Sequence, residues 1–169
     1  MELKAGDVFA SKNPQGLGKL ILMAERIKSQ DQKAEYGHCG IIINSGGNTL
    51  ECVFHVQSQN LFDAYKGQKV IIARWVGMTP EKFQQGYNAI KDQIGKVYPW
   101  YRLVLYVVGL ARWIQLSDVP VCSEYEDKFE YCCGVPTLSD GHYWGVTPDN
   151  KVDEWRISKW MNIVFEGVL

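Results

Sequence analysis

One cysteine of this chain stands where catalysis could use it. Cys122 lies in the stretch VPVCSEYEDKFEYCCG, where Pro120 interrupts the preceding segment and the apolar residues that follow have helical spacing. A helix beginning there would place the thiol at its N-terminus, whose partial charge of about +0.5 favours a thiolate. Glu124, Glu126 and Asp127 oppose that ionisation. A reactive Cys122 therefore needs a cation from elsewhere in the chain, and a histidine is the natural source.

The predicted helix has a start signal and one apolar face. Ser123 and Glu126 have the spacing of a capping box, in which each side chain caps an N–H group of the first turn. Cys132 and Cys133 lie about two to three turns further along, away from the positive end of the helix, so we predict structural roles for both. The apolar face is formed by Tyr125, Phe129, Cys132 and Cys133.

Residues 38–56, HCGIIINSGGNTLECVFHV, predict a β-hairpin, because two strand-like runs flank the turn-forming sequence SGGN. Side chains alternate between the two faces, and one face is wholly apolar. Cys39 and Cys52 fall on that face, so we expect both to be buried and chemically inert. His38 and Glu51 share the other, mixed face. We expect the cysteine helix to pack against this mixed face, with His38 supplying the cation.

Two registers of this hairpin remain open. A four-residue turn would place His55 directly opposite His38, which makes His55 a rival base. A tighter turn would instead place Glu51 opposite His38. In either register Glu51 shares the face of His38, because side chains alternate with a period of two. The third histidine, His142, lies in a glycine-containing loop and is predicted to be a surface residue.

The other elements that must position these residues suggest one mixed domain. Thr79-Pro80 has the composition of a helix start, with Thr as the N-cap and Pro at the first helical position. Strands with interspersed helices indicate an α+β domain spanning residues 1–169. The expected strands are 6–11, 69–75 and a closing strand within 156–169; the expected helices are 17–28, the segment from 79 to 97, and 101–114.

Composition narrows the function classes. The net charge of −1 gives no basic field for nucleic acid. The longest apolar run, 103–111, is too short to span a bilayer, and the first residues do not resemble a signal peptide. Five cysteines without a Cys-x-x-Cys pair indicate reduced thiols rather than disulfides or a zinc site. We therefore expect a cytoplasmic protein with no integral membrane segment, no cofactor and no metal.

Thiol catalysis requires three groups that this sequence offers. They are a cysteine at a helix N-terminus, a histidine at the start of a strand, and a carboxylate on the next strand. The thiolate attacks a carbonyl carbon, the imidazole keeps the thiol ionised and then protonates the leaving group, and a third polar group orients the imidazole. Backbone N–H groups at the helix N-terminus can stabilise the oxyanion.

These motifs resemble those of NlpC-type papain-like enzymes. In that family a cysteine-bearing helix precedes a Gly-Asp strand and a His-x-Gly-Ile strand. Here AGDVF (5–9) is similar to the first strand, HCGIII (38–43) is similar to the second, and the helix VCSEYEDKF (121–129) comes last. The rotated order is similar to that of the circularly permuted, YiiX-like branch. The resemblance covers the chain to about residue 56 and then 120–133.

The resemblance implies a papain-like domain in which an antiparallel sheet or half-barrel packs against helices. It makes Cys122 the nucleophile, His38 the base and Glu51 the orienting group. The implied activity is a thiol hydrolase that cleaves an amide or ester in a peptide, a peptidoglycan stem or an acyl-lipid. A lipid acyltransferase and a non-catalytic binding module on the same fold are the alternatives, and the oligomeric state is left open. We assign Tyr36, Trp100 and Tyr101 as candidate substrate-binding residues.

Overall fold

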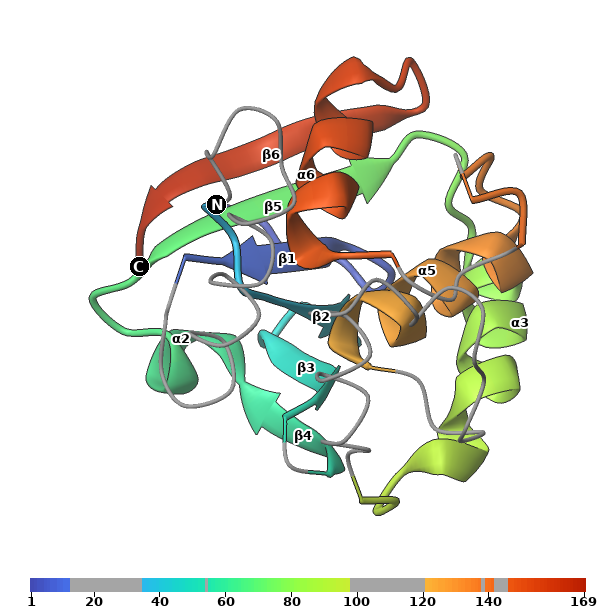
Figure 1. The fold of residues 1–169 in the computed structure, drawn as a ribbon, viewed down its shortest axis with the longest axis horizontal. Coiled ribbons are helices and arrows are strands. Elements are labelled where there is room, and N and C mark those ends of the chain that lie inside the picture. The colour runs from blue at the N-terminus through green and yellow to red at the C-terminus, as the bar shows by residue number, and fades with distance from the viewer. Residues whose placement is uncertain (13–34, 54, 98–120, 138, 142–145) are drawn as a thin grey trace, which may run out of the picture.

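A computed structural model describes residues 1–12, 35–53, 55–97, 121–137, 139–141 and 146–169. Six antiparallel strands form one sheet in the order β4-β3-β2-β1-β5-β6 (Figure 1). The chain is thus a mixed α+β domain with an antiparallel sheet, as predicted. The strands are β1 (Val8–Ser11), β2 (His38–Ile42), β3 (Asn48–Cys52), β4 (Val56–Asn60), β5 (Lys69–Trp75) and β6 (Met161–Val168).

Two of the helices begin with the same local signal. Thr79 and Thr147 each precede a proline, and each side chain accepts a hydrogen bond from a backbone N–H of the first turn. The first of these helices was predicted from sequence. The second was not predicted, although Thr147-Pro148 repeats the pattern of Thr79-Pro80. The helices are α2 (Leu61–Ala64), α3 (Pro80–Ile90), a 3₁₀ turn η1 (Lys91–Gln93), α5 (Cys122–Cys133) and α6 (Pro148–Ile157).

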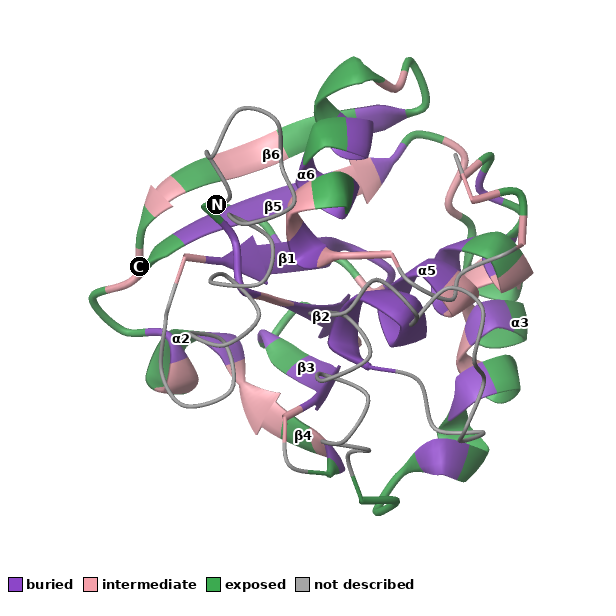
Figure 2. Cartoon of the chain, in the orientation of Figure 1, coloured by how far each residue is buried: buried purple, intermediate pink, exposed green. Residues whose placement is uncertain are grey.

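The two faces of the sheet carry separate apolar clusters, and buried residues concentrate in the central strands (Figure 2). Helices α5 and α6 lie on the face that holds Cys39 and Cys52, and α3 packs against α5 on the same side. The opposite face, which holds Phe9 and Tyr65, is covered in part by α2. The expectation that the cysteine helix packs against the mixed face of the hairpin is therefore wrong. Helix α5 lies on the wholly apolar face, where its own apolar side chains are removed from water.

The β2–β3 hairpin adopts neither of the two registers expected from sequence. Ile41 pairs with Leu50 and Ile42 with Thr49, so Gly40 stands opposite Glu51. The register lies midway between the two expected ones, and within the turn the N–H of Gly47 donates to the carbonyl of Asn44 over 3.2 Å. Side-chain parity is unchanged, so His38 and Glu51 still share one face.

Some expected elements cannot be compared with the structure. The predicted helices 17–28 and 101–114 lie outside the described residues, and so does His142. Within the part of the chain that is described, no helix combines the length and the apolar character needed to cross a membrane.

Candidate active site

His38 and Glu51 form a direct pair at the start of β2. The Nε2 atom of His38 lies 2.7 Å from Oε2 of Glu51. The side chain of His38 is 14% exposed and that of Glu51 is fully buried. Gly40 makes this approach possible, because a Cβ atom at that position would lie 2.9 Å from Cβ of Glu51 and 2.8 Å from the ring of Phe9. The pairing predicted from parity is thus present, through a diagonal contact between neighbouring strands.

Glu51 is held by three donors. Thr49 Oγ1 lies 2.5 Å from Oε1, and the hydroxyl of Tyr65 donates to Oε2, the oxygen that also faces His38. Burial alone would raise the pKa of Glu51. The hydrogen bond and positive charge of His38, together with the two hydroxyl donors, outweigh burial and place the pKa of Glu51 below its usual value. The carboxylate is therefore ionised at neutral pH.

Cys122 is the first residue of α5, with Val121 as the N-cap. The expected capping box between Ser123 and Glu126 is wrong. Ser123 instead donates its hydroxyl to the carbonyl of Val146 over 2.6 Å, and Glu124 accepts the N–H of Val121 over 3.1 Å. The acid that caps the N-terminus of α5 is thus Glu124. The thiol of Cys122 lies at the positive end of the helix dipole.

The Cys122 sulfur is hydrogen-bonded to Cys39 and to His38. These bonds and the imidazolium charge overcome burial and hold the pKa of Cys122 well below its usual value. The pKa of Cys39 is raised, by burial and by the same contact, so Cys39 stays a thiol and donates to Cys122. Its predicted burial is confirmed. Its contact with Cys122 was missed, because the cysteine helix was expected to pack against the mixed face of the hairpin, whereas Cys39 lies on the apolar face.

The same contacts fix the charge of His38. Burial lowers the pKa of the imidazole, but the hydrogen bonds with Cys122 and Glu51 raise it to about 10. Because Nε2 faces Glu51, Nδ1 is the nitrogen left for the thiol. The result is a thiolate–imidazolium pair backed by a carboxylate, with the N–H groups of the first turn of α5 beside it.

Other residues named from sequence have different surroundings. Tyr36 is buried, and its hydroxyl donates to Glu166 of β6 over 3.2 Å. Trp100 and Tyr101 lie outside the described residues. His55, the rival base, is exposed and forms an isolated bridge with Val97. The structure therefore joins Cys122 to His38 rather than to His55.

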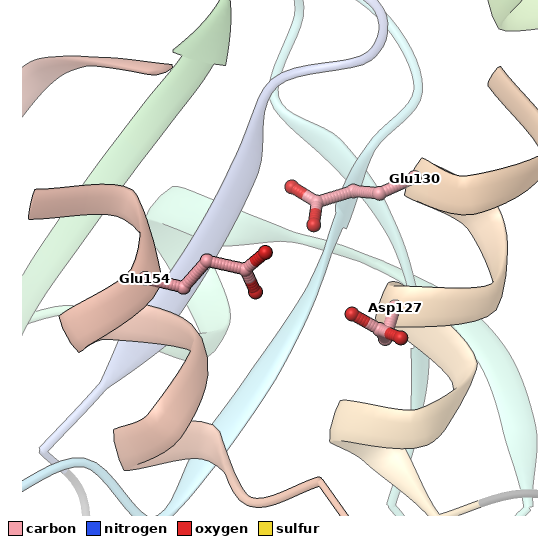
Figure 3. A group of neighbouring side chains, drawn as sticks. All are labelled: Asp127, Glu130 and Glu154. Atoms are coloured by element: carbon pink, nitrogen blue, oxygen red, sulfur yellow. The ribbon is translucent and has the colours of Figure 1, made fainter. Parts of the chain in front are cut away.

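A second buried charged cluster, which the sequence did not reveal, lies between α5 and α6. The Nζ atom of Lys151 is fully buried and lies 2.7 Å from Asp127, 2.6 Å from Glu130 and 2.6 Å from Glu154. Figure 3 shows the three carboxylates converging from the two helices. Burial raises the pKa of the neighbouring Glu126, so this carboxyl favours its neutral form. We refer to Lys151, Glu126, Asp127, Glu130 and Glu154 as the lysine–acid cluster.

Comparisons with known proteins show a similarity in fold. No known protein-family model and no curated protein sequence matches this chain. The structure is similar to a crystal structure described as metalloprotein yiiX from Escherichia coli O157:H7, DUF1105. The TM-score is 0.66, the alignment covers 100% of both chains and the identity is 16%. At that identity the likeness establishes a shared fold and nothing further about activity.

Proposed function

We propose that this protein is a thiol hydrolase that cleaves an amide or ester through Cys122, His38 and Glu51. The observation that carries the proposal is the continuous set of contacts from Glu51 to Nε2 of His38 at 2.7 Å and from His38 to the Cys122 sulfur. Such a chain supplies an ionised nucleophile, a proton carrier and an orienting group.

In the proposed reaction the Cys122 thiolate attacks the substrate carbonyl carbon and forms a tetrahedral oxyanion. Backbone N–H groups at the start of α5 stabilise the oxyanion. As the bond to the leaving nitrogen or oxygen breaks, the imidazolium of His38 gives that atom a proton, and a thioester remains. Neutral His38 then takes a proton from water, whose oxygen attacks the thioester. The acid product leaves, and the thiolate–imidazolium pair is restored. Glu51 stays ionised and keeps Nε2 in its orientation throughout.

We also propose that the domain is a circularly permuted papain-like fold. The histidine strand precedes the cysteine helix in the chain, which is the reverse of the NlpC-type order. Support comes from the chain ends: Leu3 and Leu169 pack in the same apolar cluster, and both termini lie at one side of the sheet (Figure 1). Neighbouring termini are the condition under which a fold tolerates permutation.

The word metalloprotein in the description of yiiX raises the question of a metal here. Among the described residues, the group of three potential ligands close enough to share an ion is Asp127, Glu130 and Glu154. The ammonium group of Lys151 stands within 2.7 Å of all three carboxylates and supplies the positive charge. These residues do not fit a resident metal ion in this arrangement, and the proposed mechanism uses none.

A second candidate reaction is acyl transfer. Cys122 is only 2% exposed, and a thioester formed at an enclosed sulfur is shielded from water. If a substrate alcohol or amine reaches the thioester before water does, the same residues transfer the acyl group. Product analysis with and without added acceptor alcohols, at matched acyl-donor concentrations, separates transfer from hydrolysis.

The test of the proposed function is site-resolved alkylation. Native protein is treated with iodoacetamide at pH 6, and each of the five cysteines is quantified by peptide mass spectrometry. Cys122 should react faster than a free thiol, because its pKa lies well below the usual value of about 8.5. The His38→Ala variant should lose that advantage, whereas His55→Ala should keep it. Uniformly slow labelling would instead support a binding module with an idle thiol.

A further inference from the structure

The carboxylate of Glu51 accepts more hydrogen bonds than it needs to orient the imidazole of His38. Its two oxygens are fully buried and receive three donors. Oε1 accepts from Thr49, and Oε2 accepts from both His38 and Tyr65. Since a buried carboxylate without donors is strongly destabilised, each donor contributes to keeping Glu51 charged.

The two hydroxyl donors are not equivalent. Thr49 lies two residues from Glu51 on β3, and its Oγ1 is also 3.1 Å from the carbonyl of Gln59. Its single hydroxyl hydrogen can serve only one acceptor well. Tyr65 reaches Glu51 from a separate element, directly after α2. Tyr65 and His38 both donate to Oε2 of Glu51. The hydroxyl of Tyr65 therefore helps to fix the position of the oxygen that accepts from the imidazole.

The ring of Tyr65 is fixed independently of its hydroxyl. It is 5% exposed and packs edge-to-face on Phe9 with centroids 5.2 Å apart. It lies nearly parallel to the His38 ring, at 14° and 6.2 Å. Burial and the charge of Glu51 raise the pKa of Tyr65, so the hydroxyl remains protonated and acts only as a donor. Removal of the oxygen alone should leave the ring in place.

We propose that Tyr65 is a positioning residue for the reaction at Cys122: its hydroxyl anchors Oε2 of Glu51 and keeps that carboxylate anionic beside His38. This inference rests on the proposed function. Without the hydroxyl, Glu51 takes up a proton at higher pH, and the neutral carboxyl no longer stabilises the imidazolium. Formation of the Cys122 thiolate then also moves to higher pH, because thiolate and imidazolium stabilise each other.

The experiment measures the rate of Cys122 alkylation by iodoacetamide between pH 3 and 9 in the wild type and in Tyr65→Phe. Tyr65→Phe should move the acid limb of the profile upward by about half to one pH unit. Loss of one hydrogen bond to a charged group corresponds to about one to two pH units at Glu51 itself, and only part of that shift reaches Cys122 through His38. Turnover of any ester substrate should fall by about 3- to 30-fold, as expected for a residue that acts through another group. Tyr125→Phe is the matched control, because it also removes one buried hydroxyl, which donates to the carbonyl of Ile90 over 3.2 Å.

A double-substitution cycle tests whether the effect passes through Glu51. In a Glu51→Gln background the charge is absent, so adding Tyr65→Phe should leave the acid limb where Glu51→Gln alone puts it. An equal shift in both backgrounds, or a Tyr65→Phe profile that superimposes on the wild type, would overturn the inference. An unreactive wild-type Cys122 would instead overturn the proposed function itself.

A second variant covers the case in which Tyr65→Phe does not fold. Site-specific replacement of Tyr65 by 3,5-difluorotyrosine keeps the shape of the ring and makes the hydroxyl a stronger donor. The acid limb should then move to lower pH. Movement to higher pH, or no movement, contradicts the proposed role.

Discussion

The candidate active site and the lysine–acid cluster both contain buried carboxylates, but the groups around those carboxylates differ. At the candidate active site one carboxylate, Glu51, has a single basic partner, His38, and His38 in turn contacts a thiol. In the lysine–acid cluster one ammonium, Lys151, contacts three carboxylates and no nucleophile. Both regions are shielded from water. The difference shows that burial of charge does not by itself indicate chemistry. A proton carrier adjacent to a nucleophile does.

The largest expected effect is a loss of activity, and only substitutions at the candidate active site should cause it. Cys122→Ala and His38→Ala should abolish turnover of an ester substrate, because they remove the nucleophile and the proton carrier. Lys151 variants that still fold should retain turnover. The control is Cys132→Ala, at the far end of α5 and only partly buried. Substantial turnover by Cys122→Ala would remove the proposed mechanism.

The next largest expected effect is a loss of stability on substitution of Lys151 in the lysine–acid cluster. Lys151→Met should lower the free energy of unfolding by about 3–5 kcal/mol, because it leaves buried carboxylates without their cation. Urea denaturation at pH 7 measures the change, with the exposed Lys66→Met as the matched control. A loss below about 1 kcal/mol, the range of surface ion pairs, would mean that the cluster is not the buried network described above.

Glu51→Gln tests whether the first region depends on charge. Turnover should fall by about 10- to 1000-fold with the fold retained, since the amide can still accept a ring N–H but carries no charge. The pKa of His38 is raised to about 10 in part by Glu51, so we expect activity to fall as pH rises through that value. In the variant this basic limb should move to lower pH. A pH–rate profile with both limbs unchanged would exclude Glu51 as the orienting residue.

Glu126→Gln tests the pH dependence of the second region. The pKa of Glu126 is raised by burial, so the folded protein holds a proton that the unfolded chain releases above about pH 4.5. That difference costs stability as pH rises. The variant has no such proton and should therefore be more stable than the wild type at pH 8, with a smaller difference at pH 4. Thermal unfolding at the two pH values measures this, and a gain confined to pH 4 would contradict the sign.

The smallest expected effect is on the pH dependence of Cys122 alkylation. It should distinguish Cys39 from Cys52, two buried thiols on the same face of the sheet. Cys39→Ala removes a hydrogen bond to Cys122 and should move the acid limb of Cys122 alkylation upward by about half a pH unit. Cys52→Ala should leave the limb in place, and each variant should lose about 1 kcal/mol of stability. Equal profiles for the two variants would show that the contact with Cys39 does not control the thiol.

Local patterns predicted the elements that carry the site, and parity predicted one of its contacts. The alternation of side chains in the hairpin predicted that His38 and Glu51 share one face. That prediction holds although the observed register differs from both expected ones. The Thr79-Pro80 helix start was read correctly, whereas the same signal at Thr147-Pro148 was overlooked. Tyr65 gave no local signal, because Glu51 is distant in sequence. Lys151 has a helical i,i+3 spacing to Glu154, but its other two partners, Asp127 and Glu130, are distant in sequence and no periodicity connects them to it.

By itself the sequence determined which residues could react and which strand face they share, because side-chain direction along a strand follows from covalent geometry. Tertiary structure decided which face of the hairpin α5 covers, and hence that Cys39 as well as His38 contacts Cys122. It also decided that Tyr65 contacts Glu51 and that Lys151 of α6 contacts Asp127 and Glu130 of α5. These contacts join separate elements, so they depend on how apolar faces pack together and not on any spacing along the chain.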